Sequence, residues 1–164
     1  MKRLRNRNQL LDPVDVALLR ALHADARTTM TELARAVGLS APSAAERVRR
    51  LEEAGVVRGY AARIDPAALG LALSAYIRVR PMPGQLRNVA EVLQAIEAVV
   101  ACDRVTGEDC YVVKVHTASL AALETVIDQI TPYAMTNTSI IQSSPIDERL
   151  PPLAGPASAN GRAR

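Results

Sequence analysis

Residues 29–55 read TMTELARAVGLSAPSAAERVRRLEEAG, and this stretch decides the fold of the first third of the chain. Thr29 followed three residues later by Glu32 is a reciprocal capping pattern, which predicts the start of a helix. Gly38 predicts the end of that helix, and Ser40 is a typical N-cap residue for the next one. Two short helices joined by a glycine-containing turn form a helix-turn-helix arrangement.

The residues on either side of this stretch predict a further helix before it and a strand after it. A helix is expected over about residues 12–23, because Asp12 can cap its first amide groups and Pro13 occupies a position that needs no hydrogen-bond donor. After the helix pair, residues 56–64 have a short β-type pattern that stops at an Asp-Pro pair. We therefore expect a connecting strand there.

The second half of the sequence alternates strand and helix patterns in the order strand, helix, strand, strand, helix, strand. This order is the split βαβ, or ferredoxin-like, arrangement. Both helices must cover the same face of its antiparallel sheet, because each crossover is right-handed. The other face still carries apolar residues, so a second copy of the chain, forming a homodimer, is its most economical partner. The predicted strands cover residues 71–80, 99–105, 110–117 and 138–144, and the predicted helices cover 86–96 and 120–130.

Length and composition fit a two-part α+β protein. The chain has 164 residues, of which 49% are hydrophobic and 23% charged, as in ordinary soluble domains. No apolar run approaches the roughly 18 residues of a membrane span, and no apolar stretch follows the basic start, so we expect a cytoplasmic protein without a membrane partner. The expected parts are a basic flexible arm (1–10), a helix-turn-helix domain (11–59), a linker strand (60–70), a ferredoxin-like domain (71–149) and a disordered tail (150–164).

Charged side chains gather on one side of the helix that follows Ser40. Ser43, Arg47 and Arg50 recur at helical spacing opposite the apolar stripe, and such a face fits the major groove of DNA. A solvated arginine-rich helix is the simpler alternative in a chain that prefers Arg to Lys. The tight turn before the helix favours double-stranded DNA, whereas an aromatic content of 2% disfavours base-stacking platforms for single strands. The predicted DNA-binding residues are Arg35, Ser40, Ser43, Arg47, Arg49 and Arg50.

A second candidate site is the hairpin turn at residues 106–109. Glu108, Asp109 and the following Tyr111 offer carboxylates, backbone donors and a hydroxyl to a small cationic or zwitterionic ligand. Spacing alone favours a plain polar turn, because glycine-acidic turns are common hairpin connections.

No motif for catalysis, nucleotide binding or metal binding occurs in the sequence. His23 and His116 lack a second ligand at metal spacing, and Cys102 and Cys110 are expected to be core thiols. We therefore expect no catalytic residue, no metal and no cofactor.

Five stretches share the pattern of one family: LDPVD (11–15), TELARAVGLS (31–40), ERVRRLEEAGVVRGY (46–60), VTGEDCY (105–111) and TNT (136–138). Over about Leu11 to Arg149 the chain resembles the Lrp/AsnC (feast/famine) transcription regulators. The resemblance implies a winged-type helix-turn-helix domain joined to an amino-acid-sensing domain of the RAM type. It also implies dimerisation through the sheet and assembly into larger rings, often octamers.

The resemblance further implies a DNA-binding transcription regulator that responds to an amino-acid effector. Many members carry an aspartate where this chain has Cys110. Two alternatives remain: an enzyme like the Lrp-like sirohaem decarboxylases, which the scarcity of histidine disfavours, and an architectural DNA-binding protein without a ligand. The effector-binding residues implied by the resemblance are Gly107, Glu108, Asp109, Cys110, Tyr111, Thr136, Asn137 and Thr138.

Overall fold

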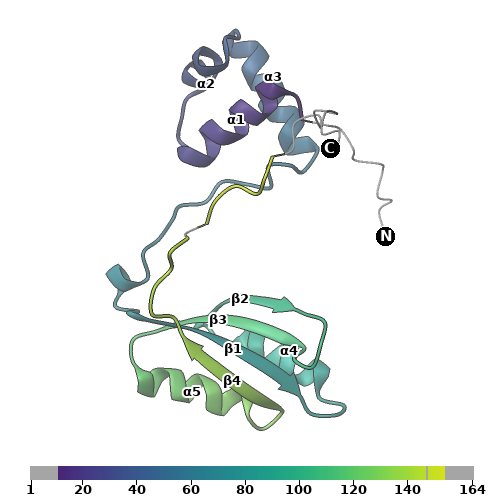
Figure 1. Ribbon diagram of the computed structural model, residues 1–164, viewed down its shortest axis with the longest axis vertical. Coiled ribbons are helices and arrows are strands. Elements are labelled where there is room, and N and C mark those ends of the chain that lie inside the picture. Colours follow the sequence, from purple (N-terminus) through teal and green to yellow (C-terminus); the bar gives the residue numbers. More distant parts are fainter. Residues whose placement is uncertain (1–10, 147, 154–164) are drawn as a thin grey trace, which may run out of the picture. The chain divides into compact units, whose positions relative to one another are not determined.

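The computed structural model describes residues 11–146 and 148–153. The described residues divide into a sheet unit over Arg63–Pro145 and a helical unit that contains residues 11–62, 146 and 148–153 (Figure 1). The basic arm predicted over 1–10 and residues 154–164 of the predicted tail lie outside the described residues. No described helix is long and apolar enough to cross a membrane.

The described residues of the helical unit form three helices, and each begins at its predicted cap. Asp12, Thr29 and Ser40 accept a hydrogen bond from the backbone N–H three residues later, at 2.8, 3.3 and 3.3 Å. Gly38 ends the second helix with a φ of 70°, a left-handed conformation that favours glycine. The helices are α1 (Pro13–Ala24), α2 (Met30–Val37) and α3 (Ala41–Glu53).

The helices of this unit pack around their own hydrophobic core. Ala34 of α2 and Ala44 of α3 are both buried, and such small side chains allow the two helices to approach closely. The core cluster consists of Leu18, Leu22, Leu33 and Val48.

Residues 56–64, predicted as a connecting strand, contain no strand in the structure. They are nearly all exposed, and a short 3-10 helix, Ala67–Leu69, is the next regular element. A strand is held by hydrogen bonds to a neighbouring strand, and the described residues place none beside this segment. Its β-type composition was therefore misleading.

The sheet unit confirms the predicted ferredoxin-like order. Its four strands form one antiparallel sheet in the order β2-β3-β1-β4. The elements are β1 (Leu73–Pro81), α4 (Leu86–Ala95), β2 (Val99–Arg104), β3 (Tyr111–Thr117), α5 (Leu120–Ile130) and β4 (Ala134–Ile140).

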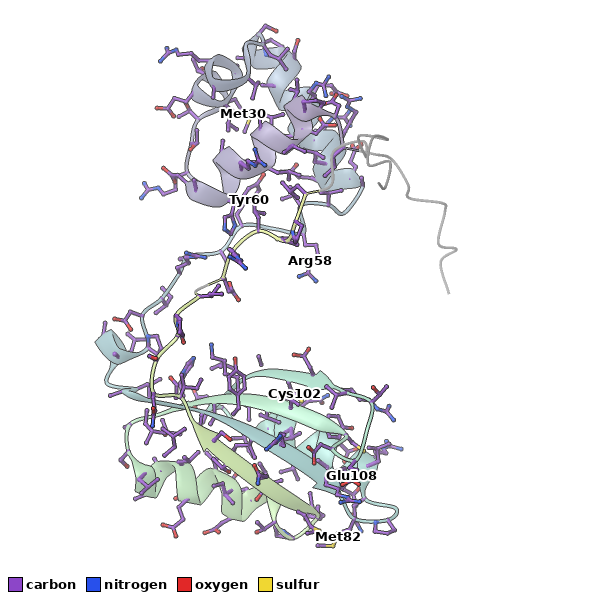
Figure 2. The ribbon with its side chains drawn as sticks, in the orientation of Figure 1. Met30, Arg58, Tyr60, Met82, Cys102 and Glu108 are labelled. Carbon is purple, nitrogen blue, oxygen red and sulfur yellow. The ribbon has the colours of Figure 1, made fainter. Side chains whose placement is uncertain are left out.

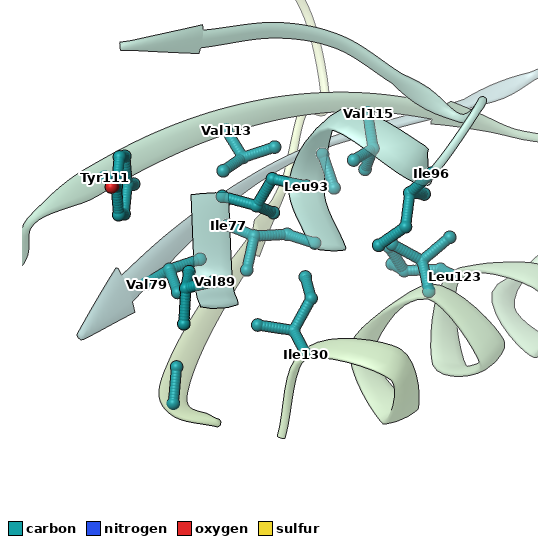
Figure 3. Packing of buried hydrophobic residues seen from close by; sticks show 13 residues of the cluster. Ile77, Val79, Val89, Leu93, Ile96, Tyr111, Val113, Val115, Leu123 and Ile130 are labelled. Atoms are coloured by element: carbon teal, nitrogen blue, oxygen red, sulfur yellow. The ribbon is translucent and has the colours of Figure 1, made fainter. Parts of the chain in front are cut away.

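Both helices of the sheet unit pack on one face of the sheet, as right-handed crossovers require (Figure 3). Alternate residues such as Ile77 of β1 and Val113 of β3 are fully buried there, in one cluster with Leu93 of α4 and Ile130 of α5. The opposite face, which we call the open face, is mixed in character. From β1 and β4 it presents Ser74, Tyr76, Arg78, Arg80, Met135, Asn137 and Ser139.

The last strand begins and ends four residues earlier than the predicted range of 138–144. Ala134 pairs with Pro81, and Ile140 pairs with Ala75, so β4 follows β1 along most of its length. Polar residues at 136–138 weakened the strand pattern in the sequence. The neighbouring strand decides where β4 starts, and that information is not local.

Cys102 is exposed, so the expectation of a core thiol is wrong at this position. It lies on β2, an edge strand with a neighbour on one side only. Cys110 is half-buried and directly precedes β3.

Candidate functional site

The solvent-facing side of α3 combines small polar residues with arginines. A shallow depression on this side is lined by Leu39, Pro42, Ser43, Glu46, Arg47 and Arg50. Ser40 uses its hydroxyl to cap the helix, and this hydroxyl also lies 2.9 Å from that of Ser43, which is exposed. Five of the six predicted DNA-binding residues thus belong to α3 or its cap, and the sixth, Arg35, is exposed on α2.

Arg47 is held by carboxylates of α1. Its Nη1 atom donates hydrogen bonds to Asp12 Oδ2 at 2.6 Å and to Asp15 Oδ1 at 2.8 Å. The hydrogen bond from the Asp15 backbone N–H, followed by that from Arg47, lowers the pKa of the Asp12 carboxyl, and the two carboxylates raise the pKa of Arg47. Arg47 is therefore bound to another helix of its own unit.

Arg49 is paired along its own helix. It donates to both oxygens of Glu46, at 3.0 and 2.7 Å, and to Glu53 one turn further on. The hydrogen bond from Arg49 lowers the pKa of Glu46. Arg50, by contrast, is exposed and makes no salt bridge within the described part of the chain, so its guanidinium is available to a partner.

The second candidate site is the turn between β2 and β3. Gly107 has a φ of 115°, a backbone conformation that L side chains rarely adopt. The Cys110 backbone N–H donates to the Val79 carbonyl at 3.1 Å, which ties the turn to β1. Glu108 and Met82 lie toward the same end of the sheet (Figure 2). The turn therefore stands where β1 ends.

Two arginines of β1 connect this turn with β4. Arg80 Nη1 lies 3.2 Å from Glu108 Oε2, and Arg78 Nε lies 3.9 Å from Asp109 Oδ2. Arg78 also donates to Asn137 Oδ1 at 2.9 Å. On the open face, both charges of the turn and an amide of β4 thus converge on the central strand.

The other predicted effector residues do not join this cluster. Tyr111 is buried, and its hydroxyl donates to the Leu86 carbonyl of α4 at 3.2 Å. Thr136 and Thr138 pair with Val79 and Ile77, so they lie on the helix-covered side of the sheet. The predicted set is therefore divided between two faces.

Comparison with known proteins connects both units to one family. Residues 11–52 match the AsnC-type helix-turn-helix domain, and residues 74–151 match the Lrp/AsnC ligand binding domain. The chain belongs to the Lrp/AsnC family. This finding confirms the resemblance inferred from the sequence.

Individual members of the Lrp/AsnC family are similar to this chain over nearly their full length. The HTH-type transcriptional regulator LrpA of Mycobacterium tuberculosis is 43% identical over 145 residues, covering 87% of this chain and 97% of LrpA. The structure of Bacillus subtilis LrpC has a TM-score of 0.80 and 34% identity, over 85% of this chain and 99% of that one. The structure of a feast or famine regulatory protein of M. tuberculosis, complexed with L-methionine, has a TM-score of 0.78 and 42% identity. The match covers 85% of this chain and 97% of that one.

Sequence reasoning about this Lrp/AsnC family member missed Arg78 and Arg80. Alternation along the predicted strand 71–80 places both on its polar side, which is where they lie. Their contacts depend on the pairing of β1 with β4 and on the position of the 107–111 turn, so no local pattern could have identified them. The available signal was weak: two arginines two residues apart on one strand face.

Proposed function

We propose that this protein is a sequence-specific regulator of transcription that binds double-stranded DNA and responds to an amino acid. The observation that carries the proposal is the exposed side of α3, on which Arg50 makes no salt bridge with any other described residue. This side follows the tight Gly38 turn in a chain of the Lrp/AsnC family. An α-helix fits the major groove, where arginine can donate two hydrogen bonds to guanine.

In this proposal the DNA-binding residues differ in role. Arg50 and Arg35 have no salt bridge to other residues that the structure describes, so they can contact bases or phosphates, and Ser43 can reach the DNA backbone from the start of α3. Arg49 would have to exchange its carboxylate partners for phosphate, and Ser40 acts through its cap. The basic residues within 1–10 add phosphate contacts.

The proposed effector site is the turn at residues 107–111 with the facing part of β4. A free amino acid carries an ammonium and a carboxylate, and the cluster offers both complements: Glu108 and Asp109 for the ammonium, Arg78 and Arg80 for the carboxylate. A relative complexed with L-methionine supports an amino acid as the ligand class.

We also propose that two copies pair through the open face and that dimers assemble further, as octamers. Tyr76 and Met135 expose 44% and 66% of their surface there, among polar neighbours. A partner sheet would cover these apolar side chains.

Selection of duplexes from a random-sequence pool, followed by gel-shift titration over salt, tests DNA binding. The wild type should select one sequence pattern. Arg50→Ala should reduce affinity for it and lower the log–log salt slope by roughly 0.9 if Arg50 contacts a phosphate. Arg20→Ala, an exposed arginine on α1, is the matched control and should behave as the wild type. Selection of no common sequence would refute the proposal.

Thermal-shift measurements with each standard amino acid test the effector site. At least one should raise the melting temperature and change DNA affinity, with a coupling free energy of about 1–3 kcal/mol. Glu108→Gln should weaken this response, because it removes a charge that would face the ammonium. Glu97→Gln, an exposed carboxylate outside the turn, is the control. An undiminished response in Glu108→Gln would contradict the assignment.

A further inference from the structure

Arg47 stands apart from the other arginines of α3 because its partners belong to another helix. Asp12 and Asp15 are separated from it by 35 and 32 residues in the sequence. Arg49 pairs only with glutamates of α3 among the described residues, and those pairs fix nothing between helices. Arg47 is thus the arginine of α3 that can hold this helix in place relative to α1.

The two carboxylates that receive Arg47 are themselves fixed. Asp12 uses Oδ1 to accept the Asp15 backbone N–H at 2.8 Å, and Asp15 uses Oδ2 to accept the Asp12 backbone N–H at 3.4 Å. Each acid therefore gives one oxygen to the capping box of α1 and the other to Arg47. Such an arrangement is stiff, because the acceptors cannot turn without losing the cap.

The three side chains are also partly removed from solvent. Arg47 exposes 25% of its side chain, Asp15 19% and Asp12 43%. The two acids lie beside the solvent-facing side of α3, where unpaired carboxylates would repel phosphates. Arg47 compensates part of this charge locally.

We infer that Arg47 is a positioning residue: it locks α3 against the start of α1 and neutralises the acids there, and it leaves DNA contact to neighbouring residues such as Arg50. The inference rests on the proposed function. It differs from the prediction from sequence, in which Arg47 contacts DNA directly. Helical spacing placed Arg47 on the same side as Arg50, but the carboxylates of α1 occupy its guanidinium.

The first test compares two substitutions that change the net charge equally. Asp15→Asn and Asp25→Asn each remove one negative charge from α1 or its cap, and the Asp25 carboxylate accepts a hydrogen bond from the nearby Arg27 backbone N–H. Attraction to phosphate alone would make both variants bind DNA more tightly. We expect Asp25→Asn to bind at least as tightly as the wild type. Asp15→Asn should bind the selected duplex roughly tenfold more weakly, since one well-placed base contact is worth about that much.

The second test compares Arg47→Ala with Arg50→Ala, at a temperature where circular dichroism shows both variants folded. Arg47→Ala should lose affinity and sequence discrimination. Combined with Asp15→Asn, which restores the net charge of this cluster of side chains, it should also keep the salt slope of the wild type. Arg50→Ala should show a reduced slope. If Arg47→Ala does not fold, the comparison of Asp15→Asn with Asp25→Asn decides whether Arg47 is a positioning residue.

Three results would overturn the inference. A reduced salt slope in the charge-matched double variant Arg47→Ala/Asp15→Asn would make Arg47 a phosphate contact, and wild-type affinity in a folded but less stable Arg47→Ala would make it merely structural. Equal or tighter binding by Asp15→Asn relative to Asp25→Asn would show that the acids hold nothing that DNA binding needs. A wild type that selects no duplex would instead refute the proposed function.

Discussion

The Asp12 carboxyl accepts hydrogen bonds from the Asp15 backbone N–H and from Arg47, and both lower its pKa below the ordinary value of 3.8. A carboxyl with a lowered pKa stabilises the folded state above its unfolded pKa, and this contribution is lost as the pH falls through the folded pKa. We therefore expect the helical unit to lose stability on acidification below about pH 4. Arg47→Ala should flatten this dependence, because one cause of the shift is removed.

Thermal melts of the wild type and Arg47→Ala at a series of pH values would measure the difference. The Glu32 carboxyl, whose pKa is also lowered by its hydrogen bonds with Thr29, is present in both proteins and cancels in the comparison. If the melting temperatures of the two proteins had the same dependence on pH, Arg47 would not be a cause of the lowered pKa of Asp12.

Single residues also show where sequence reasoning ends. Asp12, Thr29 and Ser40 were identified as caps because a cap depends on residues within one helical turn. The roles of Arg47 and Arg80 depend on residues distant in the sequence, so helical or strand spacing could place these side chains on a face but could not name their partners.

At the scale of elements, α2 is the helix in which the contribution of an N-cap to stability can best be measured. It has only eight residues, and Thr29 and Glu32 satisfy each other's backbone N–H groups at its start. Thr29→Ala should lower the free energy of unfolding of the helical unit by about 0.5–2 kcal/mol in urea titrations. Thr31→Ala, an exposed position in the first turn, should be neutral or slightly stabilising, because alanine favours helix. Equal losses in both variants would argue against the cap.

Some helices and strands could be predicted from local sequence patterns, and others could not. All five α-helices lie within about two residues of their predicted ranges. The strand predicted over 56–64 is absent, and β4 is displaced from its predicted range. Both errors arise because a strand forms only beside another strand, and that neighbour can be distant in the sequence. β1 was well predicted, since its buried face alternates strictly.

At the scale of the whole molecule, the two units have separate hydrophobic clusters without a shared residue. Ile77 and Leu33 are both fully buried, one in each. Truncation of such residues to alanine lowers the free energy of unfolding by about 2–5 kcal/mol. Ile77→Ala should accelerate hydrogen exchange in β1–β4 and leave α1–α3 unchanged, and Leu33→Ala should do the reverse. Acceleration of both units by either variant would show that they unfold together.

The placement of Arg78 and Arg80 has a consequence for signalling. These side chains extend from the open face, the surface proposed for pairing with a second copy, and they also hold Glu108 and Asp109 of the turn. An effector bound as proposed would separate these ion pairs, because its ammonium would face the acids and its carboxylate would face the guanidinium groups. Under the proposed pairing of two copies, occupancy of the turn would thus change the distribution of charge that this surface presents to the neighbouring subunit.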